Sequence, residues 1–194
     1  GNSVHRATRG DAADSSTGVP NRPDCCPGDI TQRRFQMAIY LHVEGLEGDV
    51  TAAGHEGWIE CESMDFGVSR SISTRTGSSQ ERESTAPTLS DVTIVKAMDK
   101  CTTKLFEQAC IGTSKLVKID LVQTGEQLDT YMSYELTDSL ITSHATSSAG
   151  EGRPTESVSF NFTKILMKYT PYDNKHKPGS PIPAGYDVSL GKKV

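Results

Sequence analysis

Long apolar runs are missing from this sequence, and so are the usual marks of a membrane-bound or nucleic-acid-binding chain. No stretch approaches the roughly 20 apolar residues of a membrane-spanning helix, so we expect no membrane insertion. The N-terminus also lacks a charged start followed by an apolar core, the pattern of a cleaved signal peptide. The net charge is −5 and no strongly basic stretch occurs, which argues against nucleic acid as a partner.

Cysteine is scarce and irregularly spaced. Five cysteines among 194 residues, with no repeated spacing and no C-x-x-C pair, do not suggest a disulfide framework. We interpret Cys61, Cys101 and Cys110 as small side chains that are buried or half-buried. Synthesis in a reducing cytoplasm follows from this interpretation.

Catalytic motifs are missing as well. The sequence has no G-x-S-x-G elbow, no phosphate-binding glycine loop and no H-E-x-x-H or H-x-x-x-H pair. His55 and Glu56, placed between glycines, predict a solvated turn, and Glu60 with Glu62 predicts a solvated strand face rather than a glycosidase pair. We therefore expect no catalytic residues, no metal site, no cofactor and no enzymatic activity.

Residues 1–36 differ from the rest of the chain. They contain three prolines and five arginines, no lysine and no glutamate, and they follow neither a strand nor a helix period. We interpret them as a leader derived from an expression vector, with Met37 as the native start; a natural disordered arm is the alternative. Residues 37–194 then form a single domain.

Strand patterns dominate from Met37 onward. Apolar and polar side chains alternate in Ile39–Glu44, Trp58–Phe66, Val117–Leu121, Met132–Leu136, Val158–Phe162 and Ile165–Tyr169. Between the last two segments the phase of the alternation changes, which predicts a bulge or a change of buried face within one long strand. Tyr186–Leu190 is the predicted final strand.

One helix interrupts the strands. Asp99 is its predicted N-cap, Gly112 its predicted stop, and Leu105 and Ala109 form its apolar face, with Phe106 and Cys110 as further candidates for that face. Two long polar segments, Ser69–Ser90 and Ser143–Pro154, are predicted loops. This pattern predicts a mainly β fold: a two-sheet β-barrel with one short flanking α-helix and a long extended loop.

Five segments, taken in order along the chain, resemble the haemolysin-coregulated protein (Hcp) family, the inner-tube proteins of the bacterial type VI secretion system. They are Met37–Val50, Trp58–Ser69, Asp91–Leu105, Pro154–Ile165 and Gly185–Val188. The third contains Lys96-Ala97-Met98-Asp99-Lys100, which is similar to a lysine-x-x-aspartate-lysine step in the family. Tyr186 stands where the family often has tryptophan.

The resemblance implies a subunit that assembles into hexameric rings, which stack into a tube inside a contractile sheath. Such a tube carries effector proteins in its lumen and is expelled together with a spike protein. The implied partners are other copies of this chain, the spike, the sheath and baseplate, and the effectors. The protein would be made in the bacterial cytoplasm and secreted, or delivered into a target cell, without a cleaved signal peptide.

The segment Ser69–Ser90 is the candidate site for stacking one ring on the next. Its charged residues Arg75, Glu81, Arg82 and Glu83 carry both signs, which suits docking of protein subunits better than phosphate binding. An ordinary surface loop is the other interpretation. Two functions stay open beside the tube subunit: a soluble ligand- or carbohydrate-binding β-barrel, although Trp58 is the only tryptophan, and an enzyme of unknown type.

Overall fold

The computed structural model describes residues 36–74, 82–124, 128–150, 152–173 and 177–194. All of them belong to one compact unit, Arg34–Val194. The predicted leader, residues 1–36, lies outside the described residues apart from Gln36, so its origin stays a prediction. In the described part of the chain, no helix has the length and apolarity needed to cross a membrane.

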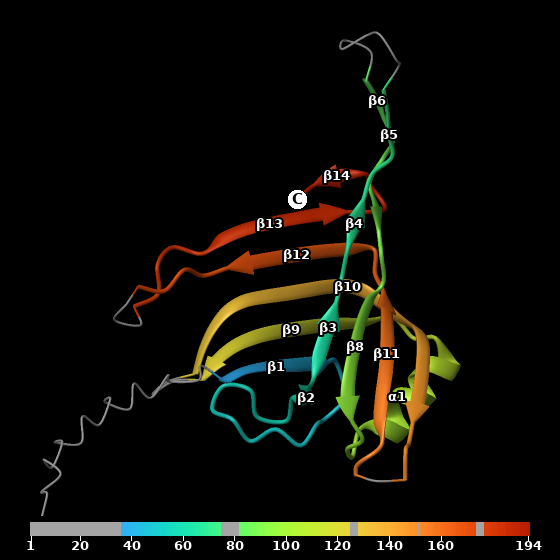
Figure 1. The fold of residues 1–194 in the computed structure, drawn as a ribbon, viewed down its shortest axis with the longest axis vertical. Coiled ribbons are helices and arrows are strands. Elements are labelled where there is room, and N and C mark those ends of the chain that lie inside the picture. Colours follow the sequence, from blue (N-terminus) through green and yellow to red (C-terminus); the bar gives the residue numbers. More distant parts are fainter. Residues whose placement is uncertain (1–35, 75–81, 125–127, 151, 174–176) are drawn as a thin grey trace, which may run out of the picture. The chain divides into compact units, whose positions relative to one another are not determined.

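The larger layer of the fold is an antiparallel sheet (Figure 1). In hydrogen-bonded order it contains β2 (Ile59–Cys61), β1 (Gln36–Val43), β9 (Lys115–Thr124), β10 (Leu128–Ser147), β12 (Lys164–Tyr169), β13 (Ile182–Asp187) and β14 (Lys192–Lys193). The alternation of apolar residues sets its register, because Leu41 lies opposite Ile119 and both side chains are fully buried.

The smaller layer shares β10 with the larger one. The first half of this 20-residue strand pairs with β9 and β12, and the second half pairs with β11 (Thr155–Asn161). Next to β11 lie β8 (Val92–Ala97) and β3 (Ser63–Asp65). Between the two halves of β10, Asp138 has a φ of 51°, a left-handed conformation that aspartate tolerates better than most residues. Its carboxylate accepts hydrogen bonds from Ser114 and Thr163, which hold this bend.

The two layers enclose one hydrophobic core. Its fully buried members include Leu41, Ile59, Val92, Ile94, Leu105, Val117, Ile119, Leu136 and Val158. The mainly β fold with one helix is therefore confirmed, but the sheets do not close into a continuous barrel. Between Cys61 and Ser63 the chain changes from pairing with β1 to pairing with β8, which splits the predicted strand Trp58–Phe66 into β2 and β3.

Three other strand predictions need correction. The change of phase between Val158 and Tyr169 marks the end of β11 and the start of β12, two strands that pair with different halves of β10. The first part of the predicted loop Ser143–Pro154 is strand, because β10 continues to Ser147. The predicted final strand begins earlier, at Ile182, and ends at Asp187.

Helix α1 (Thr102–Ile111) starts later than predicted. Its N-cap is Cys101 and not Asp99; the Asp99 carboxylate instead accepts a hydrogen bond from the Cys101 backbone N–H (3.0 Å). Gly112 ends the helix as predicted, with a φ of 70° and its N–H bonded to the carbonyl oxygen of Gln108. Leu105 faces the core, whereas Phe106 is 58% exposed and Cys110 is also exposed, so neither belongs to a buried face.

Candidate assembly surfaces

One face of the larger sheet remains apolar beyond the limits of the hydrophobic core. Residues directly opposite one another in neighbouring antiparallel strands point to the same face. Leu136 lies opposite Ile165, and both are buried in the core. Four residues further along β12, Tyr169 lies opposite Ile182 of β13, and the two side chains are 47% and 61% exposed. The sheet face that is buried in the core at one end of β12 is therefore exposed to solvent at its other end.

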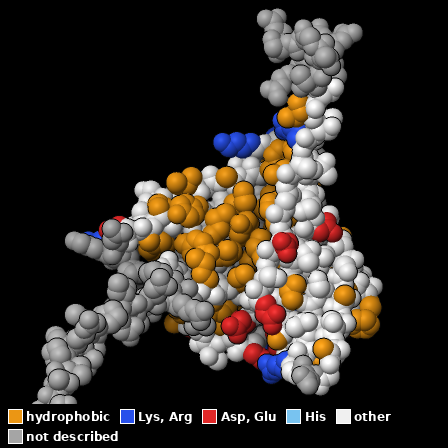
Figure 2. All heavy atoms as spheres, viewed as in Figure 1, with side chains coloured by type: hydrophobic (Ala, Val, Ile, Leu, Met, Phe, Trp, Pro, Cys, Tyr) orange, Lys and Arg blue, Asp and Glu red, His pale blue; other side chains and the backbone are white. Residues whose placement is uncertain are grey.

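This change arises because the smaller layer is narrower than the larger sheet. Figure 1 shows β3, β8 and β11 crossing one end of the larger sheet, while the end of β12 and the start of β13 extend past them. Figure 2 shows the extension as a broad hydrophobic area with few charged side chains. We call it the apolar extension; Met132, Met167, Tyr169, Ile182 and Ala184 share its face by register. Contiguous exposed apolar surface of this kind marks an interaction site.

A second protruding feature is a two-stranded arm between β3 and β8. It consists of β4 (Val68–Ser69) with β7 (Thr88–Leu89), and β5 (Ile72–Thr74) with β6 (Arg82–Ser84). The hydrogen bonds from Ser90 N–H to the Gly67 carbonyl (2.9 Å) and from Thr85 N–H to the Ser71 carbonyl (3.1 Å) join the two sides. The predicted loop Ser69–Ser90 is therefore a hairpin along much of its length.

The four predicted stacking residues lie on or near this arm. Arg82 and Glu83 belong to β6, opposite Thr74 and Ser73. Arg75 and Glu81 lie outside the described residues, so their charge pairs stay a prediction. The arm also carries two exposed apolar side chains, Val68 (66%) and Ile72 (53%). An isolated two-stranded hairpin is marginally stable at best.

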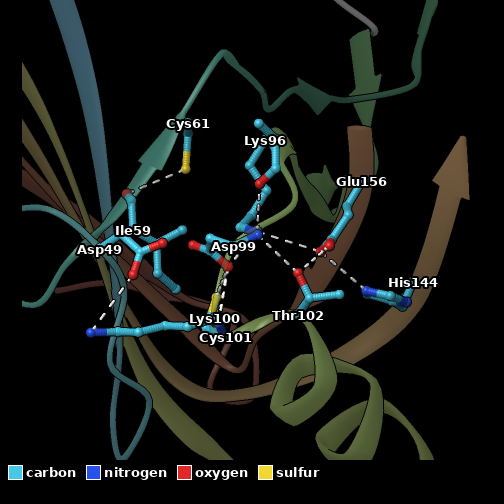
Figure 3. Close-up of polar contacts among 11 residues, drawn as sticks. Asp49, Ile59, Cys61, Lys96, Asp99, Lys100, Cys101, Thr102, His144 and Glu156 are labelled. Atoms are coloured by element: carbon cyan, nitrogen blue, oxygen red, sulfur yellow. Dashed lines mark hydrogen bonds and ion pairs between the residues drawn. The ribbon is translucent and has the colours of Figure 1, made fainter. Parts of the chain in front are cut away.

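Beneath the start of α1, a buried group of charges joins the helix to the smaller layer (Figure 3). Lys96 Nζ lies 2.9 Å from Asp99 Oδ1 and 3.5 Å from Glu156 Oε2. The Glu156 carboxylate also accepts a hydrogen bond from the Thr102 hydroxyl and lies 3.4 Å from His144 Nε2. Burial alone would lower the pKa of Lys96, but the hydrogen bond to Asp99 and the nearby carboxylates raise it above its usual value.

This charged group has a structural role. Each of its members is bonded to another member, and Lys96 and Glu156 are fully buried, so no substrate can reach them. The lysine-x-x-aspartate step noted in the sequence therefore fixes the connection between β8 and α1. Its partner Glu156 lies sixty residues further along the chain, and no local pattern revealed it.

His55 is buried, which contradicts the prediction of a solvated turn. It is 6% exposed, its Nε2 lies 3.0 Å from Asp120 Oδ2, and its ring packs edge-on against Trp58. Ser133 Oγ donates to the other oxygen of the same carboxylate (2.6 Å). Because the aspartate lies between the serine and the histidine, His55 cannot remove a proton from Ser133 as in a hydrolase triad. The contact instead holds the segment before β2 against β1 and β9.

The two buried thiols, those of Cys61 and Cys101, are poor nucleophiles. Burial raises the pKa of Cys61 to about 12. Burial and the neighbouring Asp99 also raise the pKa of Cys101, so both thiols stay protonated at neutral pH. Among the described residues, no three His, Cys, Asp or Glu side chains are grouped to hold a metal ion. Glu60 and Glu62 are both exposed, as predicted for a solvated strand face.

Comparison with solved structures places this fold among type VI secretion proteins. A structure described as a type six secretion system protein matches with a TM-score of 0.78 and 23% identity, over 82% of this chain and 100% of the other. Hcp1 from Salmonella typhimurium matches with a TM-score of 0.67 and 19% identity, over 81% and 99% of the two chains. A type VI secretion system effector from Yersinia pestis gives 0.61 and 23%, over 77% and 99%.

A comparison with curated protein sequences finds no match. The sequence model of the family described as "Type VI secretion system effector, Hcp" matches residues 40–169, which is more than half of the chain. That range contains the second half of β1, the arm, α1 and every later strand up to the end of β12. Hcp proteins are structural tube components that type VI secretion systems secrete. The chain therefore belongs to the Hcp family of type VI secretion proteins.

Proposed function

We propose that this protein forms hexameric rings that stack into the type VI secretion tube, carry effector proteins in the lumen and are themselves secreted. Family membership supports the tube role, and the apolar extension supports ring assembly. Tyr169 and Ile182 continue the face that forms the core, yet the chain's own smaller layer does not reach them. A neighbouring subunit supplies the missing cover.

Ring closure explains why this surface differs from the rest of the subunit. In a ring, each subunit presents one surface to the neighbour on one side and a different surface to the neighbour on the other. A sheet that extends past its own second layer suits this arrangement, because the next subunit can take the place of that layer. Effectors, spike, sheath and baseplate are the further partners of this proposal.

The carbohydrate-binding alternative gains no free aromatic platform from Trp58. Sugar-binding modules commonly stack a ligand on an exposed ring, and such a ring must be free of other contacts. Trp58 is half-buried, and its ring packs against His42 at 5.2 Å and His55 at 4.7 Å between centroids. The only tryptophan of the chain is thus engaged within the subunit.

Native mass tests the ring proposal. We expect light scattering of the purified protein to give about six times the subunit mass and negative-stain microscopy to show rings. Ile182→Glu places a charge in the proposed interface and should shift the protein to monomers, because desolvating an unpaired carboxylate costs several kcal/mol. The matched control is Ile111→Glu at the end of α1, where the side chain is equally exposed (60%). A monomeric wild-type protein would overturn the proposal.

The stacking role of the arm has its own test. Deleting Gly77–Ala86 removes Glu81, Arg82 and Glu83 and should leave rings intact while abolishing tubes. Tubes of normal length from this variant would refute the role proposed for Glu81, Arg82 and Glu83.

A further inference from the structure

The arm and a surface cavity lie at opposite ends of one long hairpin. Strands β3 and β8 pair through Ser63–Val95 and Asp65–Thr93, and the arm extends from the end nearer Asp65. At the other end, where β3 begins and β8 finishes, a cavity of about 560 Å³ opens beside Glu62 and Met98. Any contact between the two ends of this hairpin therefore involves two molecules.

The cavity is acidic. Its lining includes the carboxylates of Asp49, Glu60, Glu62 and Asp99, and Arg153 is its one basic residue. Two of these carboxylates already have cationic neighbours: Asp99 binds Lys96 at 2.9 Å, and Asp49 lies 3.8 Å from Lys100. Glu60 and Glu62 remain exposed at the rim and give it negative charge.

Charge is also segregated along the chain. From Met37 to Ser69 the sequence contains no lysine or arginine, and its acidic residues are Glu44, Glu47, Asp49, Glu56, Glu60, Glu62 and Asp65. Two consecutive lysines, Lys192 and Lys193, form the exposed strand β14. In Figure 1, β14 lies toward the arm's end of the view, and Figure 2 shows basic side chains there; at the opposite end acidic side chains gather, with a basic group beside them.

We propose that the acidic cavity receives the arm-bearing end of a second copy of this chain, with Lys192 and Lys193 of one copy facing Glu60 and Glu62 of the next. This inference rests on the proposed function and adds the acceptor surface for the arm. The two contacting surfaces differ, so two associated copies still have one free surface of each kind. The same contact can therefore repeat along a line, as a stack of rings requires. The exposed Val68 and Ile72 of the arm gain cover in the same contact.

Zero-length cross-linking tests the contact directly. A carbodiimide joins a lysine to a carboxylate only when the two groups touch. A mixture of ¹⁴N- and ¹⁵N-labelled protein, cross-linked at high concentration and digested, should give mixed-isotope peptides that link Lys192 or Lys193 to Glu60 or Glu62. The yield should fall several-fold in 0.5 M salt, because salt screens exposed charge pairs. Absence of such peptides overturns the proposal.

Charge exchange provides the second test. Glu60→Lys with Glu62→Lys should weaken end-to-end association about tenfold in sedimentation velocity, and so should Lys192→Glu with Lys193→Glu. Combining all four changes should restore it. The control reverses Lys104 and Lys177, two exposed lysines placed elsewhere, and should leave association unchanged. Failure of the combined variant to restore association overturns the proposal.

The two proposals fail in different ways. Rings of normal mass without the predicted cross-links would reject the cavity contact and leave the ring intact. Loss of rings themselves would reject the proposed function.

Discussion

Lys96 and Glu156 lie directly opposite each other across β8 and β11, and neither side chain is exposed to solvent. An inward-pointing charge would normally be excluded from a sheet that covers a core. Here the two charges compensate each other; Lys96 also donates to Asp99 and to the Ala97 carbonyl, and Glu156 also contacts Thr102 and His144. The start of α1 is thereby held on the end of the smaller layer.

Removing one member of this pair should be costly. Lys96→Met leaves the Glu156 carboxylate buried without its cation, and we expect the free energy of unfolding to fall by about 3–5 kcal/mol in urea titration. A double-mutant cycle with Glu156→Gln should give a coupling energy above about 1 kcal/mol. The matched control is Lys118 with Glu135, a pair 3.8 Å apart whose side chains are 42% and 44% exposed, where we expect less than about 0.5 kcal/mol. Equal coupling in the two cycles would contradict this account.

Much of the fold could be predicted from the sequence because alternation of apolar residues marks strands that are buried on one face. Val117–Leu121 and Met132–Leu136 fall inside β9 and β10 as predicted. Alternation does not show which strands pair, so the change of partner at Glu62 and the passage from β11 to β12 appeared only in the structure. Strand ends were also uncertain, since Ser143–Ser147 carries no large apolar residue yet extends β10.

The assembly surfaces were harder to predict. The apolar extension has the same alternation as the core, so Tyr169 and Ile182 could not be distinguished from buried residues before the smaller layer was placed. His55 was assigned to a solvated turn because its neighbours are Gly54, Glu56 and Gly57, but a contact with Asp120, far along the chain, buries it. Long-range contacts of this kind leave no local sequence pattern.

Alkaline pH should reveal the buried thiols. Burial raises the pKa of Cys61 in the folded state from its ordinary value of 9.0 to about 12, so between these values the folded chain holds a proton that the unfolded chain has lost. Stability therefore falls as pH rises through this window, by at most about 1.4 kcal/mol per pH unit for one thiol. Cys61→Val should make the decline shallower in urea titrations between pH 8.5 and 10.5. An equally steep decline in Cys61→Val would contradict this account.

Gly48 cannot accept a side chain. A Cβ atom at this position would overlap the Trp58 carbonyl and lie 2.7 Å from Ile59 Cα, and both obstacles are backbone. Gly48→Ala must therefore displace the start of β2, and we expect thermal unfolding to show a loss of about 2–3 kcal/mol. Gly67→Ala is the control, because its Cβ would meet only Ser90 Oγ at 3.7 Å. A Gly48→Ala protein as stable as the control variant would show that this segment can move at little cost.

Pro183 protects the outer edge of the larger sheet. The Val194 N–H donates to the Gly185 carbonyl, so Gly185 directs its backbone polar groups toward the edge rather than toward β12. Backbone polar groups alternate in direction along a strand, so those of Pro181 and Pro183 point toward the same edge as those of Gly185. Because proline has no N–H, this part of the edge offers no donor to an added strand.

Pro183→Thr removes no hydrogen bond to β12, so we expect the free energy of unfolding to change by less than about 1 kcal/mol. It does create an edge donor, and light scattering during prolonged incubation should therefore detect irregular aggregates that the wild-type protein does not form. Unchanged scattering from a stably folded variant would mean that other features, such as the charges of β14, are sufficient to protect the edge.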